Sequence, residues 1–563
     1  MSLVNVSDLT VEFGELRAVD GLSFRLEQGA ALALVGESGS GKSTVASALL
    51  GLHRGTGAKV GGSIEVAGID VTAASDEELG RLRGGKAAMV FQDPLSSLDP
   101  YYAIGDQISE VYRVHARVSR RAARARAVEV LDRVGIPDAV RRSRSRPHEF
   151  SGGMRQRALI AMALACAPDL LIADEPTTAL DVTVQAQILD LLHTLREETG
   201  MGLLLVTHDV GVAAESVDEV LVMRHGRVVE HGSVGDVLGT PAEAYTRELL
   251  GAVPRVDVRR VGAGVPLGAS SRAPSESVDP AEAAESAAEA PSPDSSGPAD
   301  DVVLEARGLR REFGRGKRAF TAVDDVSLTV RRGETLGVVG ESGSGKTTLG
   351  RMLVGLLEPT AGEVRHDGHA RVGVDPAVQM VFQDPVSSLN PRRSVGESIA
   401  DPLRARGERD EARIRGRVTE LLERVGLEGA HYDRYPHEFS GGQRQRVGIA
   451  RALAADPRVI VCDEPVSALD VTTQAQVVAL LGELQRELGL ALVFVAHDLA
   501  VVRQVSDRVA VMRRGRIVES GPADEVYDNP QDPYTKQLLA AVPALDPEVA
   551  ARRRAARREL AAA

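Results

Sequence analysis

The sequence predicts an α/β protein made of two tandem copies of one domain, each with a parallel β-sheet core. A phosphate-binding motif occurs twice. It reads Gly-Glu-Ser-Gly-Ser-Gly-Lys-Ser-Thr at residues 36–44, and it recurs at residues 340–348 with Thr347 at the position of Ser43. Near-continuous apolar runs such as residues 170–173 alternate with helical patterns, which is typical of a parallel sheet covered on both faces. Each copy opens with alternating apolar residues, such as Val4 and Val6, which predict antiparallel strands before that core.

The repeat extends well beyond the phosphate-binding motif. Ser151 matches Ser440 and His208 matches His497, and each pair is 289 positions apart. Upstream, the two phosphate-binding motifs are 304 positions apart, whereas the glutamines that follow them are 291 apart. The first copy therefore has 13 additional residues between these features (304 minus 291), and we expect them in a surface loop within residues 55–85.

The length of 563 residues exceeds what one core usually accommodates, so at least two domains are expected. Residues 273–306 contain no Lys or Arg and consist mainly of Ala, Ser, Pro and acidic residues. Such a segment buries too little apolar surface to offset its ordering entropy, which predicts a flexible acidic linker. The predicted domains are residues 1–254 and 302–545, with the linker at residues 255–301 and an Arg/Ala-rich tail at residues 546–563.

Composition and charge argue against several classes of protein. The formal net charge of −13 disfavours a sequence-independent nucleic-acid binder. Cys166 and Cys462 are the only cysteines, so no disulfide framework is expected, and we interpret both as small core residues in a reducing compartment. There is no recognisable signal peptide and no uncharged apolar run of the roughly 18–20 residues that span a bilayer. Any membrane role is therefore expected of a partner.

The two phosphate-binding motifs each follow an apolar run and precede a helical pattern. The glycines can then turn backbone N–H groups toward a polyphosphate at a helix N-terminus. Lys42 and Lys346 are expected to reach the β- and γ-phosphates, and the hydroxyls of Ser43 and Thr347 to hold Mg²⁺. A turn that merely connects strand and helix is the alternative, and the recurrence argues against it. The predicted phosphate contacts are Gly36, Ser38, Gly39, Gly41, Lys42, Ser43, Thr44, Gly340, Ser342, Gly343, Gly345, Lys346, Thr347 and Thr348.

Two acids end a predicted buried strand in each copy, as Asp174-Glu175 and as Asp463-Glu464. The first acid of each pair is expected to bind Mg²⁺ through water and the second to polarise an attacking water. A histidine ends the next apolar strand, where an imidazole can contact a γ-phosphate. These histidines are His208 and His497.

Two further motifs accompany each pair of acids. Ser-Gly-Gly at residues 151–153 and 440–442 begins a helix and forms a second anion-binding element. Gln92 and Gln383, each in Val-Phe-Gln-Asp-Pro, can bridge Mg²⁺ and a mobile loop. Each motif alone also has a purely structural explanation, such as a helix cap. Their recurrence in one order, twice, favours a nucleotide site.

With these motifs in this order, residues 1–253 and 302–545 resemble the ATP-binding-cassette family. The resemblance implies two P-loop NTPase domains, each with a parallel-sheet core, an antiparallel β subdomain and a helical subdomain. It also implies that two cassettes pack head to tail, so that Lys42 faces Ser440 and Lys346 faces Ser151 across two bound ATP molecules. The D-loop aspartates of the family correspond to Asp181 and Asp470.

The resemblance assigns a role to each motif. Glu175 and Glu464 are the implied general bases and His208 and His497 the γ-phosphate switches. Phe13 is the implied adenine-stacking residue of the first copy, whereas Phe313 and Phe320 remain alternatives in the second. The implied Mg²⁺ ligands are Ser43, Gln92, Asp174, Thr347, Gln383 and Asp463, and the implied signature contacts to ATP are Ser151, Gly152, Gly153, Ser440, Gly441 and Gly442.

Residues 241–254 and 530–543 look like the C-terminal element of dipeptide and oligopeptide importer ATPases. The resemblance implies an ATPase that energises import of peptides or a related small solute from the cytoplasmic face of the membrane. Some members carry a cysteine cluster near the C-terminus, which this chain lacks, so no iron–sulfur centre is predicted. The resemblance does not identify the cargo.

The expected partners are two permeases and an extracytoplasmic solute-binding protein. Tyr101-Tyr102 in one copy stands where Arg392-Arg393 stands in the other, on the surface that in this family receives the permeases. We therefore expect two different permeases, with drift on an exposed loop as the alternative.

Twin-cassette proteins that act on ribosomes or DNA are the alternative function. The acidic, Pro-rich spacer and the absence of zinc-binding cysteines disfavour both. The terminal arginines can contact phosphate, but a solvated helical tail is the favoured interpretation. They are Arg552, Arg553, Arg554, Arg557 and Arg558.

Overall fold

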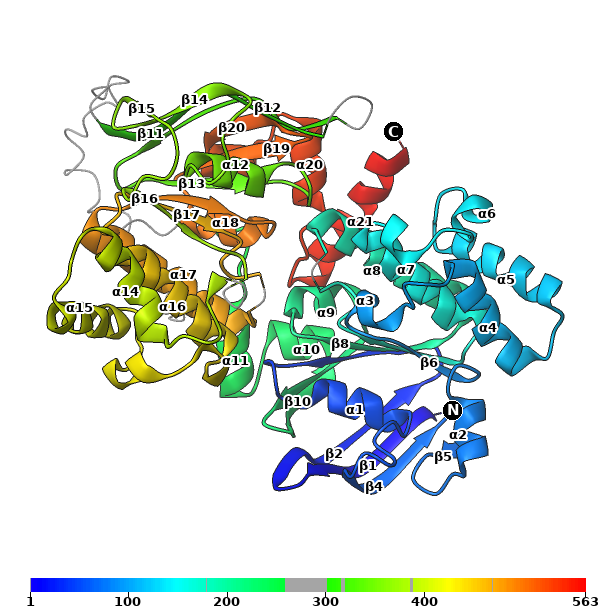
Figure 1. The fold of residues 1–563 in the computed structure, drawn as a ribbon. Helices are drawn as coiled ribbons and strands as arrows, with labels where there is room; N and C mark the ends of the chain where they lie inside the picture. The colour runs from blue at the N-terminus through cyan, green and yellow to red at the C-terminus, as the bar shows by residue number, and fades with distance from the viewer. Residues whose placement is uncertain are drawn as a thin grey trace, which may run out of the picture. The chain divides into compact units, whose positions relative to one another are not determined.

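A computed structural model of the chain describes residues 2–178, 180–258, 301–314, 319–384, 388–467 and 469–562. The chain forms two compact units (Figure 1). The first unit comprises residues 1–255, 468–475 and 533–563, and the second comprises residues 256–467 and 476–532. Most of the predicted linker, at residues 259–300, lies outside the described residues.

The core of the first unit is a six-stranded sheet with the strand order β10-β9-β3-β8-β7-β6, in which only β10 is antiparallel to its neighbour. Ala31, Ala33 and Val35 of the central strand enter one buried cluster, and Leu32 and Leu34 enter another on the opposite face. Burial on both faces explains the continuous apolar runs. The strands are β3 (Ala31–Val35), β6 (Ala87–Val90), β7 (Leu170–Asp174), β8 (Gly202–Thr207), β9 (Glu219–Arg224) and β10 (Arg227–Ser233).

A separate antiparallel sheet precedes and flanks this core, with the order β2-β1-β4-β5. Its alternating residues Val4, Val6, Leu22, Phe24 and Leu26 are buried, which confirms the predicted antiparallel strands. The strands are β1 (Ser2–Phe13), β2 (Leu16–Glu27), β4 (Lys59–Val66) and β5 (Ile69–Asp70).

The extra residues of the first copy do not form only a surface loop as expected, because most of them lie in a connection that contains the helix α2, whose Leu79 and Leu82 are buried. Ser75 and Glu78 form a capping box that starts α2, inside the range predicted for the insertion. In the second copy, residues 372–377 connect the corresponding strands without a helix. The helices are α1 (Lys42–Leu49), α2 (Asp76–Leu82), α3 (Pro94–Ser97), α4 (Ile104–Ala116), α5 (Arg120–Arg133), α6 (Ala139–Arg142), α7 (Gly152–Ala163), α8 (Val182–Thr199), α9 (Val210–Ser216), α10 (Val234–Gly239), α11 (Ala244–Ala252), α20 (Pro533–Ala540) and α21 (Pro547–Ala562).

The second unit repeats both sheets, with the orders β16-β17-β18-β13-β19-β20 and β12-β11-β14-β15. This repetition confirms the predicted α/β class, with a parallel core, an antiparallel sheet and a group of helices in each copy. The strands are β11 (Val302–Phe313), β12 (Phe320–Arg331), β13 (Thr335–Val339), β14 (Ala361–His366), β15 (His369–Arg371), β16 (Val378–Val381), β17 (Val459–Asp463), β18 (Ala491–Val495), β19 (Arg508–Arg513) and β20 (Arg516–Pro522). The helices are α12 (Lys346–Leu353), α14 (Val395–Ala405), α15 (Glu411–Arg424), α16 (Gly441–Leu453), α17 (Val471–Leu488), α18 (Leu499–Val505) and α19 (Ala523–Asp528).

The C-terminal helix differs from the sequence expectation. A solvated tail is wrong for Arg554 and Arg557, because both side chains are largely buried and paired with Asp190 of α8. Cys462 is fully buried as predicted, whereas Cys166 is only partly buried. Among the described residues, no helix is both long enough and apolar enough to cross a membrane.

Candidate functional site

The phosphate-binding loop of the first unit connects β3 to α1. Gly41 caps α1 with φ of 100°, a left-handed conformation that favours glycine. A Cβ at this position would lie 2.4 Å from the carbonyl oxygen of Ala18. Gly345 of the second unit has φ of 108°, and a Cβ added there would lie 2.3 Å from the carbonyl oxygen of Ala322. Glycine is therefore required at both positions for the loop to approach the neighbouring strand.

The lysine of each loop is buried within it. Lys42 Nζ donates to the carbonyl oxygens of Gly36 and Glu37, both at 2.8 Å. Lys346 Nζ makes the same contacts, at 2.6 and 2.9 Å. Burial lowers the pKa of Lys42, against the attraction of the carboxylates that follow β7. The loop thus places a buried positive charge beside the backbone N–H groups of a helix N-terminus, which is an arrangement that binds phosphate.

A hydroxyl and a carboxylate meet in each unit at the place predicted for Mg²⁺. Ser43 Oγ donates to Asp174 Oδ1 at 3.0 Å, and Thr347 Oγ1 donates to Asp463 Oδ1 at 3.0 Å. Burial raises the pKa of Asp174, and the bond from Ser43 opposes that shift. Hydroxyl and carboxylate oxygens are the hard donors that Mg²⁺ prefers, so this donor set fits the ion.

Glu175 stands just beyond the end of β7 with φ of 46°, an uncommon conformation for a residue other than glycine. Its carboxylate accepts from Gln92 Nε2 at 2.7 Å and from Thr178 Oγ1 at 2.9 Å. His208 Nδ1, at the end of β8, lies 3.2 Å from Glu175 Oε1. The structure therefore brings together the predicted base, the switch histidine and the bridging glutamine.

The electrostatics of this cluster favour an ionised carboxylate beside a protonated imidazole. Burial by itself would raise the pKa of Glu175, but the contacts with His208 and Thr178 outweigh it and lower the pKa. Burial by itself would lower the pKa of His208, but the contact with Glu175 outweighs it and raises the pKa. An ionised Glu175 has the protonation state that a general base needs.

The second unit repeats the cluster closely. Glu464 has φ of 47° and accepts from Gln383 Nε2 at 2.7 Å. His497 Nδ1 lies 3.2 Å from Glu464 Oε2. Ser467 replaces Thr178 and donates instead to the backbone carbonyl of Glu464, at 3.2 Å. The second carboxylate therefore lacks the hydroxyl donor that Glu175 has.

The Ser-Gly-Gly motifs start helices, as predicted. Ser151 Oγ caps α7 by accepting from Met154 N at 3.3 Å, and Ser440 Oγ caps α16 through Gln443 N at 3.3 Å. Gln443 also accepts from Ser440 N at 3.0 Å, a reciprocal bond that Met154 cannot make. Contact of these serines with nucleotide stays a prediction.

The D-loop aspartates cap the helices that follow. Asp181 accepts from Val184 N at 3.0 Å, and Asp470 accepts from Thr473 N at 2.9 Å. Within the first unit, Thr472 Oγ1 donates to the Glu37 carboxylate at 2.8 Å. Sequence reasoning missed this bond, because Thr472 and Glu37 are 435 positions apart and no motif links them.

Comparison with known proteins identifies the family. Residues 19–178 and 323–467 match the family model described as ABC transporter. The chain belongs to the ABC transporter family. Residues 229–274 and 518–562 match the model described as Oligopeptide/dipeptide transporter, C-terminal region. The chain is thus an ATPase with two ABC cassettes and two such C-terminal regions.

Relatives of this ABC protein match nearly its whole length. The Glutathione import ATP-binding protein GsiA of Salmonella choleraesuis is 46% identical over 97% of this chain and 90% of its own length. The Escherichia coli K12 protein of the same name is also 46% identical with the same coverage. Among solved structures, cbiO1 from Clostridium perfringens, part of the ABC transporter complex cbiONQ, is 30% identical. The match covers 41% of this chain and 92% of the cbiO1 chain, with a TM-score of 0.37.

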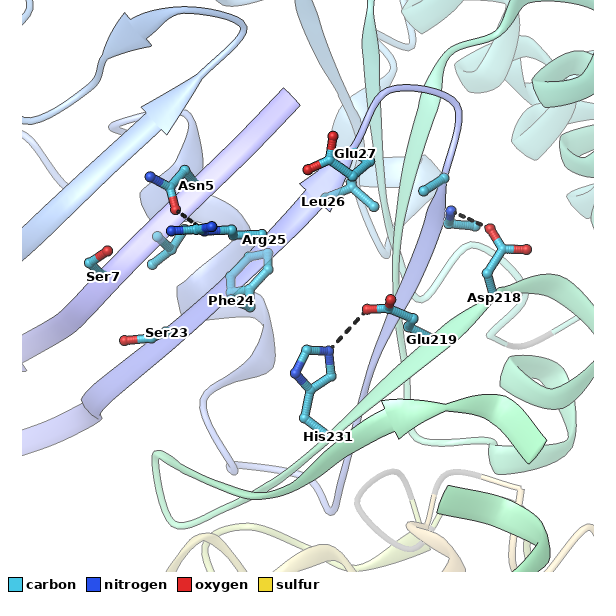
Figure 2. A pocket seen from close by; sticks show the side chains of 13 residues that line it. Asn5, Ser7, Ser23, Phe24, Arg25, Leu26, Glu27, Asp218, Glu219 and His231 are labelled. Atoms are coloured by element: carbon cyan, nitrogen blue, oxygen red, sulfur yellow. Dashed lines mark hydrogen bonds and ion pairs between the residues drawn. The ribbon is translucent and has the colours of Figure 1, made fainter. Parts of the chain in front are cut away.

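The first cassette also contains a cavity of about 490 Å³ (Figure 2). It opens between the antiparallel sheet and β9–β10. His231 Nε2 lies 3.2 Å from Glu219, and Arg25 donates to Asn5 at 3.1 Å. These polar lining groups bond to one another, and none of the predicted nucleotide-binding residues lines the cavity.

The pairing of β11 with β12 shows which of Phe313 and Phe320 corresponds to Phe13. Phe13 pairs with Leu16 in the first cassette, and Phe313 pairs with Phe320 in the second. Phe313 is therefore the counterpart of Phe13, and Phe320 occupies the place of Leu16. The Phe313 and Phe320 rings are stacked with centroids 5.5 Å apart.

Replacing Phe313 with alanine is expected to weaken ATP binding at the second cassette about 10-fold, because an aromatic stack on a base contributes about 1–3 kcal/mol. The measurement is titration with a fluorescent ATP analogue in a Lys42→Ala background, which isolates the second site. Leu16→Ala is the control, because Leu16 of the first cassette occupies the place that Phe320 has in the second. A larger loss in Phe320→Ala than in Phe313→Ala would assign the stack to Phe320.

Proposed function

We propose that this chain energises an importer for dipeptides, oligopeptides or a related small solute such as glutathione. The observation that carries the proposal is the pairing of two ABC transporter regions with two C-terminal regions of the oligopeptide/dipeptide type. Relatives named for glutathione import match nearly the whole chain. These matches favour transport over action on ribosomes or DNA.

Each ATP is proposed to lie between the phosphate loop of one cassette and the Ser-Gly-Gly motif of the other. The buried ammoniums of Lys42 and Lys346 would contact the β- and γ-phosphates. Ser151 and Ser440, at the N-termini of α7 and α16, would supply N–H donors to the γ-phosphate from the opposite side. The contact of Thr472 with Glu37 supports a D-loop that lies against the phosphate loop of the first cassette.

Hydrolysis at each site is proposed to begin with the carboxylate after the strand. Glu175 and Glu464 would accept a proton from the attacking water, and His208 and His497 would donate to the γ-phosphate. The Mg²⁺ ligands would be Ser43, Gln92, Asp174, Thr347, Gln383 and Asp463. When bound, Mg²⁺ would neutralise charge on the phosphates.

Transport is proposed to follow from ATP-driven closure. Two ATP molecules would complete the interface between cassettes, and hydrolysis would reopen it. Closure would pull the permeases into a second conformation, because nucleotide binds the two states with different affinity. The chain would sit peripherally at the cytoplasmic face of the membrane, with an extracytoplasmic binding protein delivering the cargo and no nucleic-acid partner.

The surfaces proposed to receive the permeases differ between the cassettes. Tyr101 and Tyr102 are 81% and 62% exposed in the first cassette. Arg392 and Arg393 occupy the corresponding positions of the second cassette. Arg393 pairs with Asp401 at 2.7 Å, and Arg392 is exposed. An aromatic surface and a charged surface suit different partners, which supports two distinct permeases.

Co-purification from the native cell with a tagged chain and ATP, followed by mass spectrometry, tests the proposal. Two multi-span permeases and a solute-binding protein are expected. Paired substitution of Tyr101 and Tyr102 with serine should reduce recovery of one permease, and Arg392→Ser should reduce recovery of the other. A single permease species would contradict distinct partners, and recovery of ribosomes or DNA would overturn the transport function.

A further inference from the structure

The C-terminal segment at residues 541–557 lies against the first cassette, within the first unit. Leu545 packs on the main apolar core of that cassette. Pro543 packs against the start of α9, where a Cβ on Gly211 would lie 3.0 Å from Pro543 Cβ. The helix α21 then runs beside α9. Apolar contacts thus seat the segment directly on the helix that follows the switch histidine.

Arg557 fixes α21 to two helices of the first cassette. Its guanidinium donates to Asp190 of α8 through Nη2 at 3.0 Å and Nε at 3.3 Å. Nη2 also lies 3.6 Å from Glu215 Oε2 of α9. The side chain of Arg557 is only 11% exposed. Arg554 adds a bond to the backbone carbonyl of Glu215 and lies 3.9 Å from Asp190.

Glu215 is an unusual group for a helix packed on a core. Its side chain is 1% exposed, and neither carboxylate oxygen has a hydrogen-bond partner among the described residues. Burial raises the pKa of Glu215 to about 7, although Arg557 and Arg554 favour the ionised form and oppose that shift. A buried carboxylate without hydrogen bonds is unfavourable unless a cation is held beside it. Arg557 of α21 is that cation.

The helix α9 is rigidly linked to the switch histidine. Asp209, the residue after His208, caps α9 by accepting from Gly211 N at 2.8 Å and from Val212 N at 3.2 Å. His208 contacts Glu175 at 3.2 Å. A displacement of α9 would therefore change the position of His208 relative to the carboxylate.

The two acidic residues that α21 contacts, Asp190 and Glu215, have no acidic counterparts in the second cassette. At the constant spacing of 289 residues, Ala479 stands at the counterpart of Asp190 and Gln504 at that of Glu215. In the second cassette, Arg503 of α18 instead pairs with Asp528 at 2.6 Å and with Asp524 at 3.4 Å. The two switch helices are therefore held by different contacts.

We propose that Arg557 is a positioning residue for the first ATP site, acting through Asp190 and Glu215 on the switch helix α9. The C-terminal helix that follows the second cassette thereby sets the geometry of His208 in the first. The inference rests on the proposed role of His208 as the γ-phosphate switch.

The test compares Arg557→Ala with Arg552→Ala in the full chain. Arg552 is on the same helix and is exposed, and within the described part of the chain its guanidinium bonds to the carbonyl of Glu548 on α21. Arg557→Ala is expected to lower kcat for ATP about 10-fold with KM within about twofold, because misplacement affects the transition state more than binding. Arg557→Lys should recover part of the loss, and Arg552→Ala should match the wild type.

A second readout separates the two sites. Vanadate trapping of a photoreactive ATP analogue, with mass spectrometry of the labelled peptides, reports each cassette. In Arg557→Ala and in Asp190→Asn, labelling of the first cassette should fall relative to the second. Equal loss from both cassettes, or an Arg552→Ala effect as large as that of Arg557→Ala, would overturn the inference.

A His208→Ala variant distinguishes failure of this inference from failure of the proposed function. Normal turnover in His208→Ala would reject the switch role itself. Loss of turnover in His208→Ala together with normal turnover and labelling in Arg557→Ala would reject only the positioning role.

Discussion

Replacing both Glu175 and Glu464 with glutamine is expected to reduce steady-state ATP hydrolysis by about 100-fold or more, because general-base catalysis typically contributes 10²- to 10⁴-fold. An amide preserves the size of the side chain but cannot accept the proton of the attacking water. ATP binding should persist, since the phosphate loops and their lysines are unchanged. Phosphate release and equilibrium binding of labelled ATP measure the two effects separately.

Glu219→Gln provides a matched control for that pair, because Glu219 lies in the separate cavity and contacts His231. It should leave hydrolysis unchanged. Each single variant should retain ATP at its own site and favour the closed form. Full steady-state turnover in the double variant would refute the role of both carboxylates.

Replacing Lys42 and Lys346 with alanine is expected to weaken ATP binding by about 10- to 100-fold at each site, since a charge-assisted hydrogen bond contributes about 1.5–3 kcal/mol. Both ammoniums are buried and already held by loop carbonyls. The loop is therefore prearranged for phosphate, and removing the charge should affect affinity more than folding. Equilibrium binding of labelled ATP is the measurement.

Lys59→Ala is the control for the loss of a lysine, because Lys59 is exposed on β4. It should bind ATP as the wild type does. Unchanged affinity in a folded Lys42→Ala, Lys346→Ala variant would show that these lysines do not contact the phosphates.

The buried Glu215 predicts a pH dependence of stability. Its pKa is raised from 4.5 to about 7, so the folded state holds more protons than the unfolded state between those values. Stability should therefore fall as the pH rises from about 4.5 to about 7. Glu215→Gln should remove this part of the dependence in denaturant titrations at pH 5 and pH 7, and an identical pH profile in the variant would contradict the assignment. The charged side chains that face Glu215 are Arg554, Arg557 and Asp190.

Much of each cassette was predictable because its signals are local. Strand β3 is an apolar run buried on both faces, and the insertion that forms α2 follows from a difference in spacing between motifs. The structure brings the candidate residues Gln92, Glu175 and His208 together, because all three follow strands of one parallel sheet. Parallel strands present such residues at one edge.

The remaining features depend on contacts between residues distant in sequence. Only the pairing of β11 with β12 identified Phe313 as the counterpart of Phe13, because the intervening loops differ in length. The motif at residues 36–44 gave no sign that Thr472 would bond to Glu37.

The sequence by itself determined the two ATP sites, because the residues that bind phosphate must follow strands and begin helices at fixed spacings. Only the tertiary structure showed which C-terminal arginines are buried and paired. Arg557 and Asp190 are 367 residues apart, and an arginine on an exposed helix has the same local pattern as one that is buried. The difference comes from the surface that receives the helix, where Asp190 and Glu215 supply charges that their counterparts Ala479 and Gln504 lack.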